Sequence, residues 1–323
     1  MFEEKRLGAF IVPTGIGASI GGFAGDAGNY ARKISEKCQL IVNPNVVNAA
    51  CFSAINDNML YIEGYTIDEF FKGNCFLKKS CNNKIGVIFD RSISQEVLNI
   101  HINTINAVKV VYGIDIPYYE ITDEDVGVEF FIDKTGSSHG NVNNLLTLKK
   151  AAQKLIDKGC QAIAIVCHFP ECQEDDDYSN GIGTDPVGGV EAIISHFISK
   201  ELKVPCAHSP AFDDYSITTE IVNPKCAAEY ITPTFLPCIL IGLSNAPLIK
   251  NESDSNNIGI NDLDFIIVPY NALGSIPVLK MHNMNKKIYA VKENSTVLNV
   301  NCSNFEINCD IINVYDDILE CLK

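Results

Sequence analysis

Apolar runs of strand length alternate with helical stretches along almost the whole chain, and this alternation is the strongest constraint on the fold. The runs at 8–15, 84–90 and 161–169 are apolar at nearly every position instead of alternating with polar residues. Such runs, separated by helices, are typical of parallel strands that helices cover on both faces. The sequence therefore predicts an α/β fold of mainly parallel sheets, Rossmann-like, with two lobes and a cleft between them.

The expected elements can be placed by residue number, and a polar stretch suggests where the chain divides. Residues 134–144, KTGSSHGNVNN, interrupt the pattern and favour an N-terminal α/β lobe of residues 1–140 and a C-terminal α/β lobe of residues 141–323. The expected strands are 8–15, 39–45, 84–90, 116–121, 161–169, 203–209, 236–244, 264–270 and 287–294. The expected helices are 27–37, 94–112, 145–158, 186–202 and 276–283.

Charge and cysteine content exclude several classes of function. The formal net charge of −15 would repel a phosphate backbone, so nucleic acid is not expected as a partner. Thirteen cysteines, an odd number without a CxxC pair, indicate reduced thiols in a cytoplasmic protein. The longest apolar stretch, 235–243, is interrupted by Pro237, so no membrane segment is expected. A homo-oligomer is left open.

Two glycine-rich loops resemble each other and predict a shared binding site. PTGIGASIGG has its GIG at Gly15, and NGIGTDPVGG has its GIG at Gly181, 166 residues later. Internal duplication and coincidence both account for the likeness. In either case, peptide N–H groups beside glycines can approach and hold an anion. The residues expected to bind a small anionic or polar substrate in these loops are Gly15, Gly17, Gly183, Gly188 and Gly189.

The first loop departs from the dinucleotide fingerprint, so NAD is not the expected cofactor. Gly15 and Gly17 fit the first two glycine positions, but the third falls on Ile20. The next strand ends in Asn43 and Asn45, where an acidic partner for ribose would stand. These two asparagines are expected to orient the substrate. A P-loop is excluded as well, because no GK[ST] follows the glycines.

Candidate acid–base residues cluster in the second loop and at the ends of strands. Asp185 and Glu191 flank the start of the helix at 186–202, where Asp185 could instead be only a helix cap. His168 and His208 end two strands, and ligands bind at the carboxyl ends of parallel strands. The same reasoning assigns Glu293 and Asn294, at the end of the last strand, to substrate binding. The predicted catalytic residues are Glu191, Asp185, His208 and His168.

Two other chemistries stay open. The acidic run 174–177 could hold a divalent metal or could be a solvated loop, so no metal ligands are assigned. The segment 157–171, DKGCQAIAIVCHFPE, resembles the strand-end cysteine of the aspartate/glutamate racemase group. That resemblance implies a Cys-dependent racemase-like enzyme that would use Cys167 and Cys206, although buried structural cysteines are common.

A wider resemblance covers most of the chain. The segments IVPTGIGASIGGFAGDA, LIVNPNVVNAACF, MLYIEGY, GTDPVGGVEAIISH, PCAHSPAF and YAVKENST resemble a bacterial and plastid family known only as a domain of unknown function. The resemblance implies no reaction. The residues themselves favour an enzyme that holds a small, anionic or polar metabolite between the glycine loops for non-redox acid–base chemistry, as a hydrolase, isomerase or lyase. The alternatives are a nucleotide- or metabolite-binding sensor without turnover and, less favoured, a redox enzyme.

Overall fold

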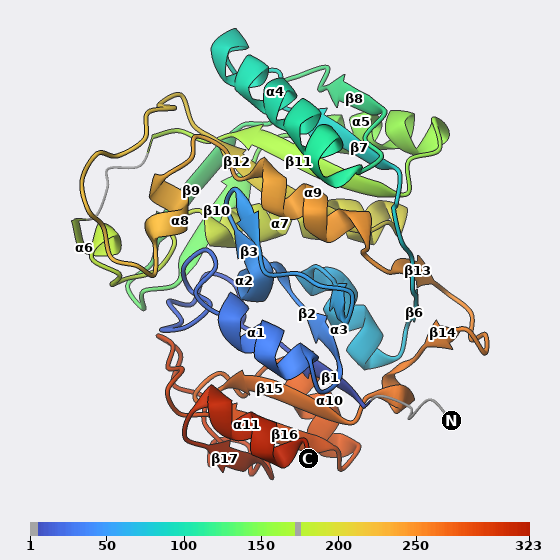
Figure 1. The fold of residues 1–323 in the computed structure, drawn as a ribbon, viewed down its shortest axis with the longest axis vertical. Coiled ribbons are helices and arrows are strands. Elements are labelled where there is room, and N and C mark those ends of the chain that lie inside the picture. Colours follow the sequence, from blue (N-terminus) through green and yellow to red (C-terminus); the bar gives the residue numbers. More distant parts are fainter. Residues whose placement is uncertain (1–5, 172–175) are drawn as a thin grey trace.

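Two parallel sheets form the framework of the protein, and they confirm the predicted α/β class. The computed structural model describes residues 6–171 and 176–323 (Figure 1). One sheet has six strands in the order β17-β16-β15-β1-β2-β5, and the other has four in the order β12-β11-β7-β8. The strands are β1 (Leu7–Phe10), β2 (Gln39–Val42), β5 (Met59–Tyr61), β7 (Ile85–Phe89), β8 (Tyr118–Ile121), β11 (Ala162–His168), β12 (Cys206–Ala211), β15 (Phe265–Pro269), β16 (Lys287–Val291) and β17 (Asp310–Ile312).

The two ends of the chain form the six-stranded sheet, and the middle of the chain forms the four-stranded sheet. Strands from residues 7–61 and 265–312 build the six-stranded sheet, whereas residues 85–211 build the four-stranded sheet. In the six-stranded sheet, β1 pairs in parallel with β15 on one side and with β2 on the other. The expected division at residue 140 stays a prediction about folding units, because the sheets alone do not test it.

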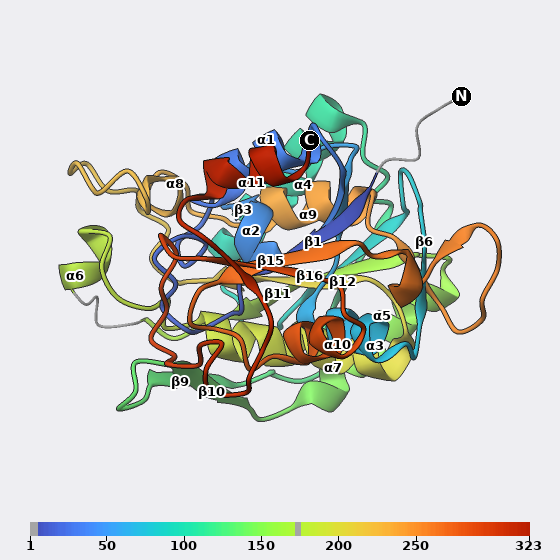
Figure 2. The same ribbon diagram turned by 90° about the horizontal axis from the view of Figure 1, so that it is seen from below.

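Helices cover the strands on both sides and form a three-layer arrangement (Figure 2). On one side lie α1 (Gly28–Ser35), α4 (Gln95–Tyr112), α9 (Leu236–Ser244) and α11 (Ile318–Cys321). On the other lie α3 (Gly64–Lys72), α5 (Leu145–Asp157), α7 (Gly188–Leu202) and α10 (Ile276–Asn283). Strands β1, β7 and β15 are buried at every position, as strands covered on both faces must be.

Local signals explain where the predicted helices begin and end. Helix α4 begins after Ser94, whose hydroxyl accepts a hydrogen bond from the amide of Val97, and it ends at Gly113 in the left-handed conformation. Helices α1, α4, α5, α7 and α10 lie within two residues of the helices expected from the sequence. Amphipathic spacing and end signals were therefore sufficient for these five.

The expectation of a strand at 236–244 was wrong, because this segment is helix α9. Eight of its nine residues are buried, so no polar face gives it a helical period. A short, wholly apolar run cannot be assigned to strand or helix from periodicity alone. Pro237 lies in the first turn, where its missing N–H has no cost, and this position is itself a signal for a helix start.

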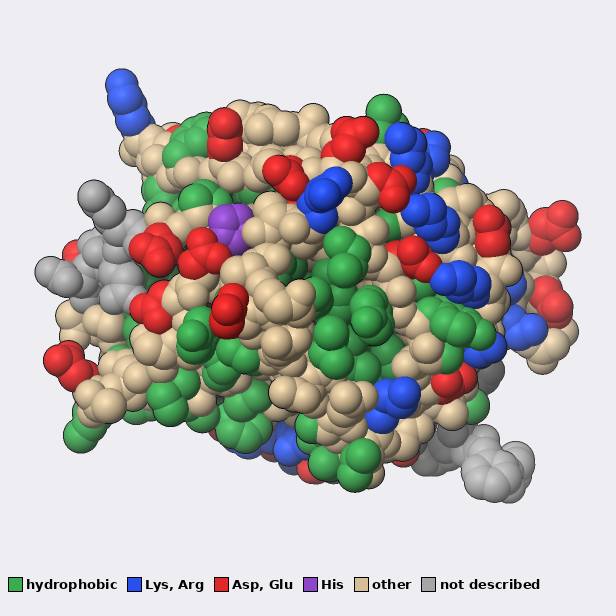
Figure 3. Space-filling view, turned by 90° about the horizontal axis from the view of Figure 1, so that it is seen from above, with side chains coloured by type: hydrophobic (Ala, Val, Ile, Leu, Met, Phe, Trp, Pro, Cys, Tyr) green, Lys and Arg blue, Asp and Glu red, His purple; other side chains and the backbone are tan. Residues whose placement is uncertain are grey.

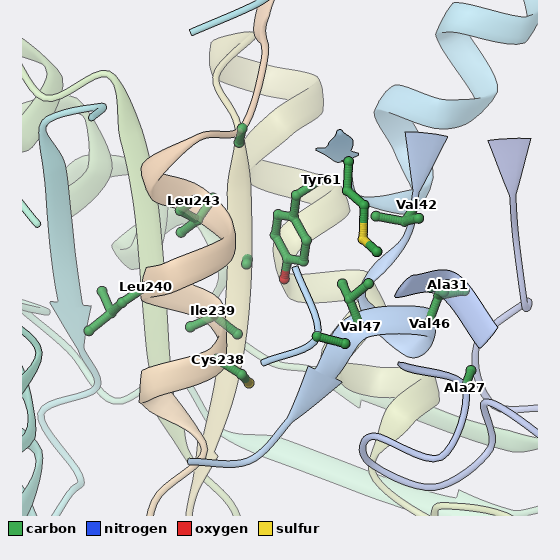
Figure 4. Close-up of a cluster of buried hydrophobic side chains, with 14 of the residues drawn as sticks. Ala27, Ala31, Val42, Val46, Val47, Tyr61, Cys238, Ile239, Leu240 and Leu243 are labelled. Carbon is green, nitrogen blue, oxygen red and sulfur yellow. The ribbon is translucent and has the colours of Figure 1, made fainter. Parts of the chain in front are cut away.

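Helix α9 is buried because it fills the junction between the two sheets. Figure 4 shows Cys238 and Ile239 directed toward Val47, while Leu240 points to the opposite side. Tyr61, at the end of β5, packs against the same helix, and a Cβ at Gly242 would come 2.9 Å from its ring. One core therefore continues from the six-stranded sheet through α9 to the four-stranded sheet.

Shorter elements complete the fold around these layers. The hairpin of β9 (Val128–Ile132) and β10 (Ser138–Val142) packs against α7. Strands β13 (Leu248–Lys250), β6 (Phe76–Lys78) and β14 (Asn257–Ile258) form an antiparallel sheet, and β3 (Asn48–Ala49) pairs with β4 (Phe52–Ser53). The remaining helices are α2 (Pro44–Val47), α6 (Asp176–Ser179), α8 (Ala227–Tyr230) and two 3₁₀ turns, Ile260–Asp262 and Tyr315–Asp317.

Strand β10 joins the two glycine loops. The amide of Ser138 donates to the carbonyl of Gly15 at 2.8 Å, and the Ser138 hydroxyl accepts from the amide of Gly189 at 3.0 Å. A Cβ at Gly189 would meet the Ser138 carbonyl oxygen at 2.2 Å, and a Cβ at Gly15 would come within 3.4 Å of the Gly189 Cα. Glycine is required at position 189 because the backbones of α7 and β10 approach each other closely.

Replacement of Gly189 by alanine is expected to push α7 away from β10. Forced overpacking of this kind costs about 3 kcal/mol of unfolding free energy at the upper end of its usual range. Gly113→Ala is the control: its φ of +69° strains alanine, but nothing lies within 4 Å, so about 1 kcal/mol is expected. Urea unfolding measures both. Equal losses in the two variants would contradict the close approach.

Candidate functional site

A cavity of about 900 Å³ lies where the carboxyl ends of strands from both sheets meet. Its wall includes Thr14 after β1, Asn45 after β2, Glu171 after β11 and Phe212 after β12. In open α/β sheets, ligands bind beyond the carboxyl ends of the strands. The size also suits a small metabolite. This cavity is therefore the candidate functional site.

Both glycine loops reach the cavity, although not through all of their glycines. Gly183 and Gly188 line it, together with Gly21 and Gly22 of the first loop. The remaining glycines predicted to bind substrate, Gly15, Gly17 and Gly189, lie behind the wall. A Cβ at Gly17 would meet the Thr184 hydroxyl at 2.4 Å, and Gly15 and Gly189 face Ser138. These three glycines hold the two loops together.

The amide groups at the start of α7 already have acceptors within the protein. The carboxylate of Asp185 accepts from the amide of Val187 at 3.0 Å and also from the amide of Gly188. The Ser138 hydroxyl accepts a hydrogen bond from the amide of Gly189. A helix N-terminus offers an anion site only through amides that are free. Here a protein carboxylate occupies the position that an anionic ligand would need.

The first loop shows the same arrangement. The amide of Gly21 donates to Asp26 at 2.7 Å, and the amide of Ala24 donates to Glu229 at 2.6 Å. Glu229 also accepts from the hydroxyl of Tyr178, at 3.1 Å and 3.0 Å for its two oxygens. Carboxylates of the chain thus bind amides of both glycine loops.

Three carboxyl groups face this cavity with raised pKa values. Burial raises the pKa of Glu229 to about 8, and the charge of Asp185 adds to the effect. Burial likewise raises the pKa of Asp185, but the amides of Val187 and Gly188 oppose the shift. Burial, followed by the charges of Asp185 and Glu229, holds the pKa of Glu191 well above its usual range. Because the three carboxyl groups share one wall, ionisation of one disfavours ionisation of the others.

His208 lies beside Glu191 and is uncharged at neutral pH. Its Nδ1 is 2.9 Å from the hydroxyl oxygen of Ser195, and its Nε2 is 3.6 Å from Oε2 of Glu191. Burial lowers the pKa of His208 to about 3. Because the imidazole is uncharged, this contact is not an ion pair at neutral pH, and the imidazole can only donate or accept a hydrogen bond.

The predicted asparagines divide into one cavity residue and two that position the first loop. Asn45 lines the cavity, and its Oδ1 accepts from the hydroxyl of Thr14 at 2.8 Å. Asn43 bonds both the amide and the carbonyl of Val12, at 3.1 Å and 2.7 Å. Asn294, fully buried, does the same for Ile20, at 3.1 Å and 2.7 Å. Asn43 and Asn294 thus fix the loop backbone on either side of Gly15 and Gly17.

The other two predicted residues lie away from the cavity wall. Glu293 accepts a hydrogen bond from the backbone amide of Tyr315. His168 has its Nε2 3.0 Å from Oδ2 of Asp213, and both side chains are partly exposed. The two thiols of the racemase comparison, Cys167 and Cys206, are buried in the core, where burial keeps their pKa values high.

Three residues that no sequence pattern predicted also line the cavity: Tyr178, Glu229 and Phe23. The rings of Phe23 and Tyr178 lie 4.9 Å apart between centroids. Glu229 lies in α8, a single turn within the irregular connection between β12 and α9. No periodic pattern marks such a connection, and only its length could have indicated a role beyond linking two elements.

The described residues contain neither a candidate metal site nor a helix that could cross a membrane. Within 6–171 and 176–323, no three His, Cys, Asp or Glu side chains lie in an arrangement that could hold a metal ion. Part of the acidic run 174–177 lies outside these ranges. In the same described part of the chain, no helix combines the length and hydrophobicity needed to cross a membrane.

Comparison with known proteins places this arrangement in a family. Residues 8–322 match the model of a family described as "Protein of unknown function (DUF3326)". The chain belongs to this family. The resemblance expected from the motifs is thereby confirmed, and the motifs that carry it include both glycine loops of the cavity. No solved structure significantly matches this DUF3326 protein.

A relative from Synechococcus sp., named an uncharacterised lipoprotein, is 38% identical over 306 residues. The aligned region covers 93% of this chain and 85% of the relative. The word lipoprotein describes that relative. The cytoplasmic location expected for this DUF3326 protein stays a prediction.

The raised pKa of Glu229 makes stability depend on pH. Its ordinary pKa is 4.5 and its folded-state pKa is about 8, so its contribution is complete below pH 4.5 and is lost as the pH rises to about 8. Glu229→Gln should match wild type near pH 5 and exceed it by roughly 2 kcal/mol at pH 8. One pKa unit corresponds to about 1.4 kcal/mol, and partial solvation reduces the full effect.

Denaturant unfolding across this pH range measures the difference. The control is Glu252→Gln, which removes an exposed carboxylate and should leave the wild-type pH profile unchanged. If the Glu229→Gln profile fell as steeply as that of wild type, Glu229 would not hold its proton in the folded state.

Proposed function

We propose that the cavity binds a small polar metabolite and catalyses a proton-transfer reaction on it without redox chemistry, as a hydrolase, isomerase or lyase. The observation that carries the proposal is the position of Glu191: its side chain lines the cavity, yet the residue is only 9% exposed. A buried carboxyl group in a water-accessible pocket is costly for folding and is typical of functional sites.

The two acids at the start of α7 suit opposite roles. Asp185 accepts two amide hydrogen bonds, which stabilise its ionised form. For Glu191, burial and the nearby negative charges both favour the protonated form. A pair of acids whose surroundings separate their pKa values can supply a general acid and a general base at one pH. Glu191 is therefore assigned as the acid and Asp185 as the base.

Neutral His208 supports this assignment. Ser195, on α7 one turn beyond Glu191, bonds Nδ1 of the imidazole and so sets the direction of Nε2 toward Glu191. The imidazole can then orient either the Glu191 carboxyl group or a polar group of the substrate. A binding protein without turnover needs hydrogen-bond partners but no protonated acid. The raised pKa of Glu191 inside the cavity therefore favours an enzyme over a sensor.

Glu191→Gln is expected to abolish proton donation while preserving the shape of a protonated glutamate. General acids contribute about 100-fold to 10,000-fold to rate, so turnover should fall at least 100-fold. Substrates can be sought by incubating the purified protein with a metabolite extract and following the consumed and formed masses. The thermal shift caused by a consumed metabolite reports binding, which the variant should retain.

Glu201→Gln provides a control on the same helix. Glu201 lies on the surface of α7 and pairs with Lys149 at 2.8 Å, so the change should leave turnover at the wild-type level. Full turnover by Glu191→Gln would overturn the assigned acid. Binding of metabolites by the wild-type protein without any consumption would favour the sensor instead.

A further inference from the structure

The described wall of the cavity is rich in carboxyl side chains and has no lysine or arginine. Among its described lining residues are five carboxyl side chains and no lysine or arginine: Glu171, Asp185, Glu191, Asp214 and Glu229. Figure 3 shows Asp and Glu side chains spread over the upper face, several of them beside a histidine at one end, while most Lys and Arg side chains lie toward the other end. The potential around such an acidic end attracts cations and repels anions.

Glu191 is a second, independent indication of a ligand. The residue is nine-tenths buried and lines the cavity, and its Oε2 lies 3.6 Å from Nε2 of His208, beyond hydrogen-bond distance. Buried polar groups normally have hydrogen-bond partners, and each exception requires an explanation. A donor group of a bound ligand would complete the hydrogen bonding of Glu191.

Two aromatic rings also lie in the wall, near the acids. Phe23 and Tyr178 both line the cavity, and the Tyr178 hydroxyl donates to Glu229. The ammonium of Lys225 lies 5.9 Å from the centre of the Phe23 ring. This ring therefore already accepts a positive charge at one face. Carboxylates beside aromatic faces are the surroundings in which proteins bind organic cations.

We propose that the metabolite bound in this cavity carries a positively charged nitrogen, as a protonated amine or a guanidinium group. The proposal rests on the proposed function and specifies its substrate class. The cation donates to the carboxyl group of Glu229, which its positive charge helps to ionise, and lies near the rings of Phe23 and Tyr178. An anionic metabolite is disfavoured, because the amides that could hold it in the two glycine loops already donate hydrogen bonds to Asp185 and Glu229.

Matched small molecules test the charge of the ligand. The probes are putrescine and agmatine as cations, 1,4-butanediol as a neutral counterpart, citrate and phosphate as anions, and magnesium chloride as an inorganic cation. Titration calorimetry on the full chain at physiological ionic strength measures affinity and stoichiometry. One or both organic cations should bind with one-to-one stoichiometry and should raise the melting temperature, whereas the diol and the anions should not.

Glu229→Gln should weaken binding of the organic cation at least tenfold. Glu252→Gln, which removes one exposed charge outside the cavity, should change affinity less than twofold and so controls for the net charge of the protein. Because Glu229→Gln could alter α8, Tyr178→Phe serves as a second variant that removes only the hydroxyl contact to Glu229. It should also weaken binding, and circular dichroism checks that both variants fold.

The outcomes separate this inference from the proposed function. Binding of the diol, citrate or phosphate without binding of either organic cation overturns the positive charge but leaves a metabolite site. Binding of magnesium alone, or equal weakening by Glu252→Gln and Glu229→Gln, also overturns the inference. If no probe binds and no extract metabolite is consumed, the proposed function fails as well.

Discussion

The close contact of two glycine loops across β10 determines the shape of the candidate site. Ser138 bonds the backbone of Gly15 on one side and that of Gly189 on the other. A side chain at Gly189 would overlap the Ser138 carbonyl. Because the loops follow strands of different sheets, this contact brings the carboxyl ends of both sheets around one space. The cavity is therefore a consequence of backbone packing, and side chains determine which groups line it.

Carboxylates of the chain occupy the positions that the sequence suggested for an anionic ligand. Glycine-rich turns before helices often expose amides to phosphate or carboxylate groups. In this protein, Asp185, Asp26 and Glu229 accept those amides themselves. The loops are thereby stabilised without a ligand, and Asp185 and Glu229 add carboxyl groups to the cavity wall. The same local geometry that predicts an anion site thus favours the opposite ligand charge once the acceptors are supplied by the protein.

The fold could be predicted from the sequence largely because its signals are local. Continuous apolar runs identified β1, β7 and β11, and end signals identified α4 and its neighbours. Helix α9 was mistaken for a strand because burial on all sides removes periodicity. In the site, Asp185, Glu191, His208 and Asn45 could be named since they stand beside glycines or at strand ends, and all four line the cavity. Tyr178 and Glu229 come from irregular segments, and their approach depends on tertiary packing that no local pattern records.

Each sheet contributes a similar unit to the cavity, but the two units differ in chemistry. In β1-α1-β2 and β11-α7-β12, a strand leads through a glycine loop and a helix to its parallel neighbour, and both GIG sequences have positive φ at their outer glycines. The second unit supplies Asp185, Glu191 and His208, whereas the first supplies Asn45 and the Phe23 ring. A metabolite between them meets ionisable groups from one unit and amide and aromatic groups from the other. In the proposed enzyme, this asymmetry separates the groups that would transfer protons from those that would orient the ligand, which a site with two equivalent halves would not do.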